Sequence, residues 1–152
     1  MTQVTTQPVP AFLPATTHAY LMRSASSLAE AIEADDVATR YACAHVAALQ
    51  AAAALLGARS VPSLAGKRRP QRNAWVLLSD VAPELADWAA YFSAGAAKRA
   101  AAEAGSTRAV SAVEADQLVR DADRFLAVVE QSLGLVPHVA VAAVADRRVV
   151  LA

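Results

Sequence analysis

The segment from Asp35 to Arg59 constrains the fold of this chain more than any other stretch. Read as a helix, it carries apolar or small side chains nearly all the way round, with alanines between larger residues such as Val37, Tyr41 and Leu55. A helix that is apolar on every face is normally surrounded by other helices. Alanine is also the best intrinsic helix former, which favours helix over sheet. The segment therefore predicts the central helix of a helical bundle.

An amphipathic pattern precedes this central segment. Residues 17–34 repeat apolar side chains at helical spacing, and Thr16 or Thr17 stands where a side-chain oxygen can cap the first turn. The central helix follows closely, and either Asp35 or Asp36 can cap it. A connection this short predicts that the two helices are antiparallel neighbours.

A third helix is predicted after a loop that contains prolines. Asn73 is placed to cap it, and Pro83 then interrupts it, because proline lacks an amide donor and clashes with the preceding turn. We expect either a kink or a restart in which Pro83 takes the first helical position. The pattern then continues in alanines to Gly105, which is a good C-terminal stop.

The last helix has the clearest start signal in the sequence. Ser111 followed by Glu114 is the pattern of a capping box, and Gly134 is placed to end the helix. One face should be apolar and buried, and the opposite face charged. The predicted apolar stripe is Leu118, Ala122, Phe125, Val129 and Leu133, and the predicted charged face is Asp116, Arg120, Asp123 and Arg124.

Together these patterns predict an all-α protein, an antiparallel four-helix bundle, with three regions. We expect a flexible arm with prolines at residues 1–14, the bundle at residues 15–134, and a docked or disordered tail at residues 135–152. The tail is rich in β-branched residues, with a possible turn between two short strands. A hairpin of two strands is only marginally stable by itself.

Composition excludes several classes of protein. With 56% hydrophobic and 18% charged residues, the chain is not of the disordered type. Zero formal net charge argues against a general polyanion binder but leaves room for a local basic patch. Cys43 is the single cysteine, so it cannot form an intramolecular disulfide. The amino end lacks the features of a secretion signal. No uninterrupted apolar run reaches the roughly 20 residues of a membrane span. We expect a cytoplasmic protein that does not enter a membrane.

The histidines do not indicate a metal site. His18, His45 and His138 are far apart, and none lies in a Glu-x-x-His or His-Glu-x-x-His arrangement of the kind that holds iron or zinc in helical proteins. The sequence also lacks a glycine-rich phosphate loop and a nucleophile elbow. We therefore expect no metal and no cofactor.

The remaining candidate chemistry lies on the central helix, at Arg40, Tyr41 and His45. Tyr41 and His45 share a helix face, whereas Arg40 points about 140° away from His45 and should reach a neighbouring helix or a second subunit. An imidazole moves protons near neutrality and a guanidinium binds phosphate oxygens, so the pair suits phosphodiester cleavage. The alternative is structural: Arg40 pairs with Asp36, and His45 is a core histidine bonded to a backbone carbonyl or a tyrosine.

A basic cluster in the loop before the third helix is a second candidate site. Its cations can contact phosphates in a salt-dependent way, although no aromatic residue lies between them for base stacking. The alternative is a solvated charged loop. The cluster consists of Lys67, Arg68, Arg69 and Arg72.

The Arg-x4-His spacing within an alanine-rich bundle resembles the HEPN superfamily, the small helical domains of prokaryotic toxins, defence systems and nucleotidyltransferase partners. The sequence TRYACAHVAALQAAAALL, followed by NAWVLLSDVAPELADWAAYFSAGAAKRAAAEAG and the capped last helix, is most similar to a small actinobacterial HEPN-like group. The resemblance covers about residues 17–133. It implies a dimeric bundle. In active members the Arg and His line a cleft at the dimer interface and cut RNA without metal, the ribose 2′-hydroxyl attacking the neighbouring phosphate.

Carried over to this chain, the resemblance implies that His45 is the acid and base and that Arg40 holds the phosphate. The chain departs from the pattern in two ways. Tyr41 stands where active members usually have a polar Asn, Asp or His, and the motif lies inside the second helix rather than near the start of a late one.

Three functional hypotheses follow. The chain is a metal-independent endoribonuclease or RNA binder, a non-catalytic dimeric module that binds a protein partner, or a nucleic-acid-binding accessory protein that uses the basic cluster at residues 67–72. The first requires Arg40 and His45 to be exposed in one cleft, whereas the second puts His45 in a sealed core. We expect a homodimer, with RNA or a protein as the further partner.

Overall fold

The computed structural model describes residues 12–59 and 73–140, and every regular element in these ranges is helical. The prediction of an all-α fold is confirmed. The elements are α1 (Ala15–Glu33), α2 (Val37–Arg59), α4 (Ala74–Val81), the short 3₁₀ helix η1 (Pro83–Leu85), α5 (Ala86–Ala94), α6 (Ala96–Glu103) and α7 (Ala112–Ser132).

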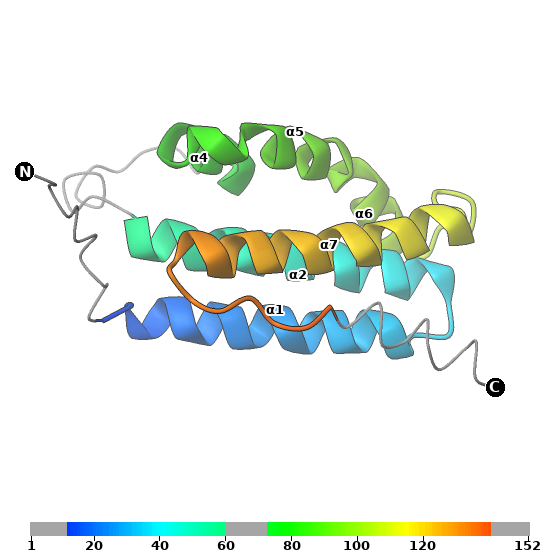
Figure 1. Cartoon of the computed structure of the whole chain (residues 1–152). Helices are drawn as coiled ribbons and strands as arrows, with labels where there is room; N and C mark the ends of the chain where they lie inside the picture. Colours follow the sequence, from blue (N-terminus) through cyan, green and yellow to red (C-terminus); the bar gives the residue numbers. More distant parts are fainter. Residues whose placement is uncertain (1–11, 60–72, 141–152) are drawn as a thin grey trace, which may run out of the picture.

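The helices are arranged around α2. Figure 1 shows α2 and α7 side by side, with α1 along one side of them and the series α4, α5 and α6 along the other. Helix α2 contacts α1, α4, α6 and α7, and its most extensive contacts are with α1 and α7. The segment that is apolar on every face is therefore the centre of the structure, as its sequence predicts.

Alanines make the close packing around α2 possible. Six alanines of α2 have an exposed fraction of 0%, and Leu55, which lies next to them, is also 0% exposed. Small side chains let neighbouring helices approach closely, and a densely packed interior leaves little space for larger ones. The fully buried alanines are Ala44, Ala47, Ala48, Ala51, Ala52 and Ala54.

Two buried hydroxyls fasten α1 to α2. Thr17 Oγ1 donates to the carbonyl oxygen of Ala54 at 2.9 Å, and Ser24 Oγ donates to that of Ala47 at 2.7 Å. Buried polar groups need such partners, because leaving one unsatisfied costs free energy. The expectation that a threonine caps α1 is wrong: the N-cap position is Pro14, and no side chain caps it. Thr17 is instead part of the contact between the two helices.

The other helix starts follow their local signals. Asp36 caps α2, Asn73 caps α4 and Ser111 caps α7, with N···O distances of 2.9, 2.9 and 3.1 Å to backbone amides two or three residues later. Each side-chain oxygen satisfies an amide that has no partner within its own helix. These three predicted caps are confirmed.

The third predicted helix is broken twice. Pro83 takes the first position of η1 after α4 has ended, so the predicted restart is confirmed. The expected continuous run to Gly105 is wrong, because a second break at Gly95 separates α5 from α6. At this break the Phe92 carbonyl accepts the Gly95 amide at 3.0 Å and also bonds His45 Nε2 at 2.9 Å. The contact between His45 of α2 and Phe92 thus lies where α5 is separated from α6. Gly105, at φ +91°, follows the end of α6.

Aromatic rings join the broken series to α7. Trp75 of α4 stacks on Phe92 of α5 with ring centroids 5.2 Å apart, and Phe92 is 5.1 Å from Phe125 of α7. Trp88 of α5 lies 5.5 Å from Phe125. Aromatic pairs at such separations add to the stability that burial of their area provides. The cluster holds α4 and α5 against α7.

Helix α7 buries the predicted apolar stripe, but its charged face contains an exception. Asp123 was expected to be exposed, and this is wrong, since only 3% of it is exposed. His138, in the segment that follows α7 and runs back along it (Figure 1), places Nε2 2.5 Å from Asp123 Oδ1 and bonds Glu130 through Nδ1. A contact from beyond the helix therefore covers one position of the polar face.

By length and composition alone, α2 could cross a membrane, with a mean hydropathy of 1.4 over its most apolar part. The sequence expectation concerned an uninterrupted apolar run, and α2 is interrupted by Arg40, His45 and Gln50. Half of that stretch is nevertheless buried, where α2 packs against α1, α4, α6 and α7. The same composition is expected of a helix at the centre of a bundle.

Enlarging a buried alanine of α2 should destabilise the fold. We expect Ala51→Leu to lower the free energy of unfolding by about 1–3 kcal/mol, because the added methyl groups have no space among the helices around them. Urea denaturation measures the change. The matched control is Ala97→Leu at an exposed position of α6, which should change stability by less than about 0.5 kcal/mol. Equal stabilities of the two variants would contradict close packing around α2.

Candidate functional site

Arg40, in the first turns of α2, is bound on both sides of its guanidinium. Nη1 lies 2.7 Å from Asp116 Oδ1 on α7, and Nη2 donates to the Ala34 carbonyl at 3.1 Å. Its side chain is 23% exposed. Asp116, and not Asp36, is thus the carboxylate that pairs with Arg40. The guanidinium ties the start of α2 to α7 and to the turn that follows α1.

His45 lies in the core, with an exposed fraction of 1%. Nε2 is 2.9 Å from the Phe92 carbonyl oxygen, and because a carbonyl only accepts, Nε2 carries the proton. The ring meets Trp75 and Phe92 edge-on, at centroid distances of 6.0 and 6.5 Å. Burial lowers the pKa of His45, the bond to Phe92 opposes this in part, and the charge of Arg99 lowers the pKa further. The imidazole is held in its neutral form.

The structure does not bring Arg40 and His45 into one cleft. Arg40 faces α7 and the α1–α2 turn, whereas His45 faces the aromatic rings of α4 and α5. Tyr41 and His45 do share a neighbour, since both lie against Gly95. The catalytic assignment of Arg40, Tyr41 and His45 stays a prediction, and the contacts give Arg40 and His45 pairing and packing partners. The basic cluster Lys67, Arg68, Arg69 and Arg72 lies outside the described residues.

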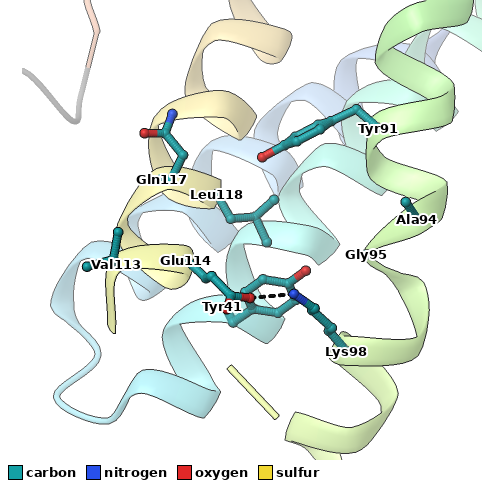
Figure 2. A pocket seen from close by; sticks show the side chains of 9 residues that line it. All are labelled: Tyr41, Tyr91, Ala94, Gly95, Lys98, Val113, Glu114, Gln117 and Leu118. Carbon is teal, nitrogen blue, oxygen red and sulfur yellow. Dashed lines mark hydrogen bonds and ion pairs between the residues drawn. The ribbon is translucent and has the colours of Figure 1, made fainter. Parts of the chain in front are cut away.

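A recess of about 430 Å³ opens beside Tyr41, between the α5–α6 break and the start of α7. Figure 2 shows side chains of α5 and α6 on one side and of α7 on the other, with the Tyr41 ring of α2 at one end. The residues that line it are Tyr41, Tyr91, Ala94, Gly95, Lys98, Val113, Glu114, Gln117 and Leu118.

Gly95 gives Tyr41 its place in this recess. A Cβ atom at position 95 would lie 2.7 Å from the Tyr41 hydroxyl oxygen and 3.5 Å from Cδ2 of His45. The backbone at Gly95 has φ −84°, which any residue can adopt, so the requirement is for space. The absence of a side chain at position 95 lets the broken helix approach Tyr41 and His45 of α2.

An ion pair crosses the recess near Tyr41. Lys98 Nζ of α6 lies 2.6 Å from Glu114 Oε2 of α7, and Figure 2 shows the pair beside the Tyr41 ring. The hydrogen bond between them raises the pKa of Lys98 and lowers the pKa of Glu114, so both groups are charged near neutrality. Ser111 also lowers the pKa of Glu114, through its side chain and its backbone amide, which agrees with the predicted capping box.

Tyr91 and Asp121 connect the two sides further along. Tyr91, 45% exposed, donates its hydroxyl to Asp121 Oδ2 at 2.5 Å, and Gln117 Nε2 donates to Oδ1 at 3.1 Å. Burial raises the pKa of Tyr91, and the bond to the Asp121 carboxylate and its charge raise the pKa further. The phenol is thus a fixed donor, and it orients the carboxylate between α5 and α7.

A second recess of about 220 Å³ adjoins the first and shares Tyr91 with it. It is lined by Asp87, Trp88, Tyr91 and Asp121. We refer to the two recesses together as the α5–α7 groove. The sequence hypotheses did not include the groove residues apart from Tyr41. The signal that was available is the helical spacing of Val113, Gln117 and Asp121 along α7, which puts an exposed apolar residue, Val113, outside the buried stripe.

Within residues 12–59 and 73–140, no group of three or more His, Cys, Asp and Glu side chains is arranged to hold a metal ion. His138 does meet two carboxylates, but it lies between them as their hydrogen-bonding partner. Burial lowers the pKa of His138, and the bonds to Asp123 and Glu130 outweigh this, so that the pKa is raised overall. His138 thus links α7 to the segment after it through hydrogen bonds to two carboxylates.

An all-helical chain packed around one alanine-rich helix agrees with the class that the sequence resembles, the HEPN superfamily of helical domains. The family model of the SAV_6107-like HEPN domains matches residues 31–130, and the chain belongs to this family. No curated protein and no solved structure matches the chain. The family match supports the assignment to the HEPN superfamily. It does not assign a role to the groove or to Arg40 and His45.

The contact between Gly95 and Tyr41 can be measured by a double-mutant cycle. In the parent, Gly95→Ala should gain helix propensity of up to about 1 kcal/mol but clash with the Tyr41 hydroxyl. In the Tyr41→Phe background the hydroxyl is absent, so the same change should be more favourable by about 1 kcal/mol or more. Urea denaturation of the four proteins gives the coupling. Additive effects would mean that Gly95 is not needed for the fit of Tyr41.

Two histidines should give stability opposite dependences on pH. The pKa of His45 is lower in the folded protein than in the unfolded chain. As pH falls below about 6.5, the unfolded chain therefore binds a proton more readily than the folded protein, and stability is lost. The raised pKa of His138 means that its contribution is complete below about 6.5 and is lost as pH rises through the folded value.

These signs are tested by measuring the free energy of unfolding of the parent, His45→Gln and His138→Gln from about pH 5 to about pH 8, the range in which histidine titrates. The deficit of His45→Gln relative to the parent should shrink in acid. The deficit of His138→Gln should be largest in acid and shrink as pH rises. Parallel curves for all three proteins would show that neither histidine has a shifted pKa.

Proposed function

We propose that this chain is a non-catalytic HEPN-like interaction module that binds a protein partner through the α5–α7 groove. In this proposal its fold is an antiparallel four-helix bundle whose third member is broken into α4, α5 and α6, and the module is a homodimer. The observation that carries the proposal is the position of His45, which is 1% exposed with Nε2 bound to the Phe92 carbonyl.

A general acid or base must come within hydrogen-bonding reach of the proton that it transfers. His45 is surrounded by Trp75 and Phe92, and its Nε2 proton is already donated. Its lowered pKa also disfavours the protonated form that a general acid needs. Arg40 would have to leave Asp116 before it could hold a phosphate. Both groups have the surroundings of residues that stabilise the fold.

The α5–α7 groove has the features of a binding surface. It is concave, and it combines apolar surface with a few oriented polar groups, which is typical of ligand and peptide sites. Tyr91 and Val113 expose large apolar side chains there, at 45% and 77%. Tyrosine is a residue type enriched at protein interfaces. These features support a protein as the partner of this surface.

The charges of the groove favour a protein over RNA at this site. Asp87, Glu114 and Asp121 line it, and Lys98, the one lysine among the described residues that line it, is paired with Glu114. Phosphates would be repelled by the carboxylates of Asp87 and Asp121. RNA binding through the basic cluster at residues 67–72 stays a prediction about a different part of the chain, as does the cytoplasmic location.

Incubation with structured RNA in excess EDTA tests whether the chain is non-catalytic. We expect no RNA ends with 2′,3′-cyclic phosphate from the parent. We also expect His45→Ala to lose about 2 kcal/mol or more of stability, since the change leaves a cavity and an unpartnered carbonyl in the core. A pancreatic-type ribonuclease serves as the positive control for the assay.

The matched control variant is His18→Ala, which removes an exposed imidazole and should leave stability nearly unchanged. His45→Gln keeps a donor for the Phe92 carbonyl and guards against loss of activity through unfolding alone. Cleavage by the parent that disappears in a folded His45→Gln variant would overturn the proposal and make His45 a catalytic residue.

A further inference from the structure

We propose that the recess of the α5–α7 groove lined by Asp87, Trp88, Tyr91 and Asp121 binds an arginine side chain of the partner protein. This inference rests on the proposed function and adds the chemistry of what is bound. A volume of about 220 Å³ is sufficient for a guanidinium group and part of its aliphatic stem.

The aromatic walls of the recess are held in fixed orientations. Trp88 stacks on Phe92 at 5.9 Å with an angle of 14° between the rings, and it meets Phe125 at 5.5 Å. Tyr91 lies edge-on to Phe92 at 5.1 Å, and its hydroxyl is bound to Asp121. Rings that are already ordered lose little conformational entropy when a ligand packs on them. The recess is therefore prepared for a flat group.

The charge of the recess is negative and is not balanced by its own lining. Asp87 and Asp121 contribute carboxylates, and among residues 12–59 and 73–140 no lysine or arginine lines this recess. The bonds that Asp121 accepts come from the neutral groups of Tyr91 and Gln117, which orient the carboxylate but leave its charge. Further along the groove, Lys98 and Glu114 neutralise each other. A cation is therefore the ligand that this end of the groove attracts.

Arginine satisfies both features of the recess at once. A planar guanidinium can stack on an aromatic face and donate paired hydrogen bonds to a carboxylate, whereas the ammonium of lysine is a compact charge that cannot stack in this way. Carboxylates beside aromatic walls thus favour arginine over lysine and both over a neutral side chain. An acidic peptide or a nucleic-acid phosphate has the wrong charge for this surface.

The probe is the blocked peptide acetyl-Arg-Arg-Arg-Arg-amide, titrated into ¹⁵N-labelled full-length protein and followed by two-dimensional NMR. We expect shifts of the Trp88 indole and of amides near Asp87, Tyr91 and Asp121, with affinity that falls as salt is added. The same peptide with citrulline, which has the shape of arginine without its charge, should bind at least about tenfold more weakly. The lysine peptide should bind less tightly than the arginine peptide.

Charge-removing variants locate the site. Asp87→Asn and Asp121→Asn should each weaken binding of the arginine peptide roughly threefold, in keeping with exposed ion pairs. Asp35→Asn, which makes the same charge change in the exposed α1–α2 turn, should leave it unchanged. Asp121→Asn also alters the bond to Tyr91, so Asp87→Asn is the variant that changes charge without touching that bond.

The outcomes separate this inference from the proposed function. Equal binding of the arginine and citrulline peptides in the groove would overturn the arginine site and leave a groove that binds protein. Shifts confined to residues outside the groove would also overturn it. Self-association that is lost in Asp87→Asn would mean that a second copy of the chain occupies the recess. RNA cleavage that depends on His45 would overturn the proposed function itself, whatever the peptides do.

Discussion

The packing of α2 against α1, α4, α6 and α7 is the constraint on which the rest of the structure depends. A helix can be surrounded in this way only if its side chains are small, and six fully buried alanines meet that condition. Close approach also brings backbone carbonyls of α2 against α1, where Thr17 and Ser24 bond them. The helix packing is therefore fixed by steric fit and by these bonds more than by the area that any one side chain buries.

Two larger residues of α2, Tyr41 and His45, decide how the third side of the structure is built. Both face the α5–α6 break, where Gly95 provides the space that they need. The proton of His45 binds the Phe92 carbonyl at this same break. The break in turn places Lys98 and Tyr91 opposite α7, which creates the groove. One set of contacts in the core thus produces the surface that we propose as the binding site.

The features that could be predicted from the sequence are those with local causes. The caps at Asp36, Asn73 and Ser111 depend on atoms two or three residues away, and the restart at Pro83 depends on proline itself. The misses involve distant partners. Asp123 is buried because His138 covers it, and Arg40 pairs with Asp116, which is 76 residues away. Spacing along a helix does not identify partners that are distant in the sequence. His45 could therefore be interpreted either as a catalytic residue or as a residue packed in the core.

The chain has zero formal net charge, but its charges are not mixed evenly along the sequence. Four cations gather at residues 67–72, while the carboxylates of Asp87 and Asp121 line the groove. The basic segment and the acidic recess attract ligand groups of opposite sign. RNA binding by the basic cluster would therefore not weigh against a protein bound in the groove. Catalysis by His45 is a separate matter, because it requires the imidazole to leave the core. Binding of a ligand to the basic cluster or to the groove does not require this.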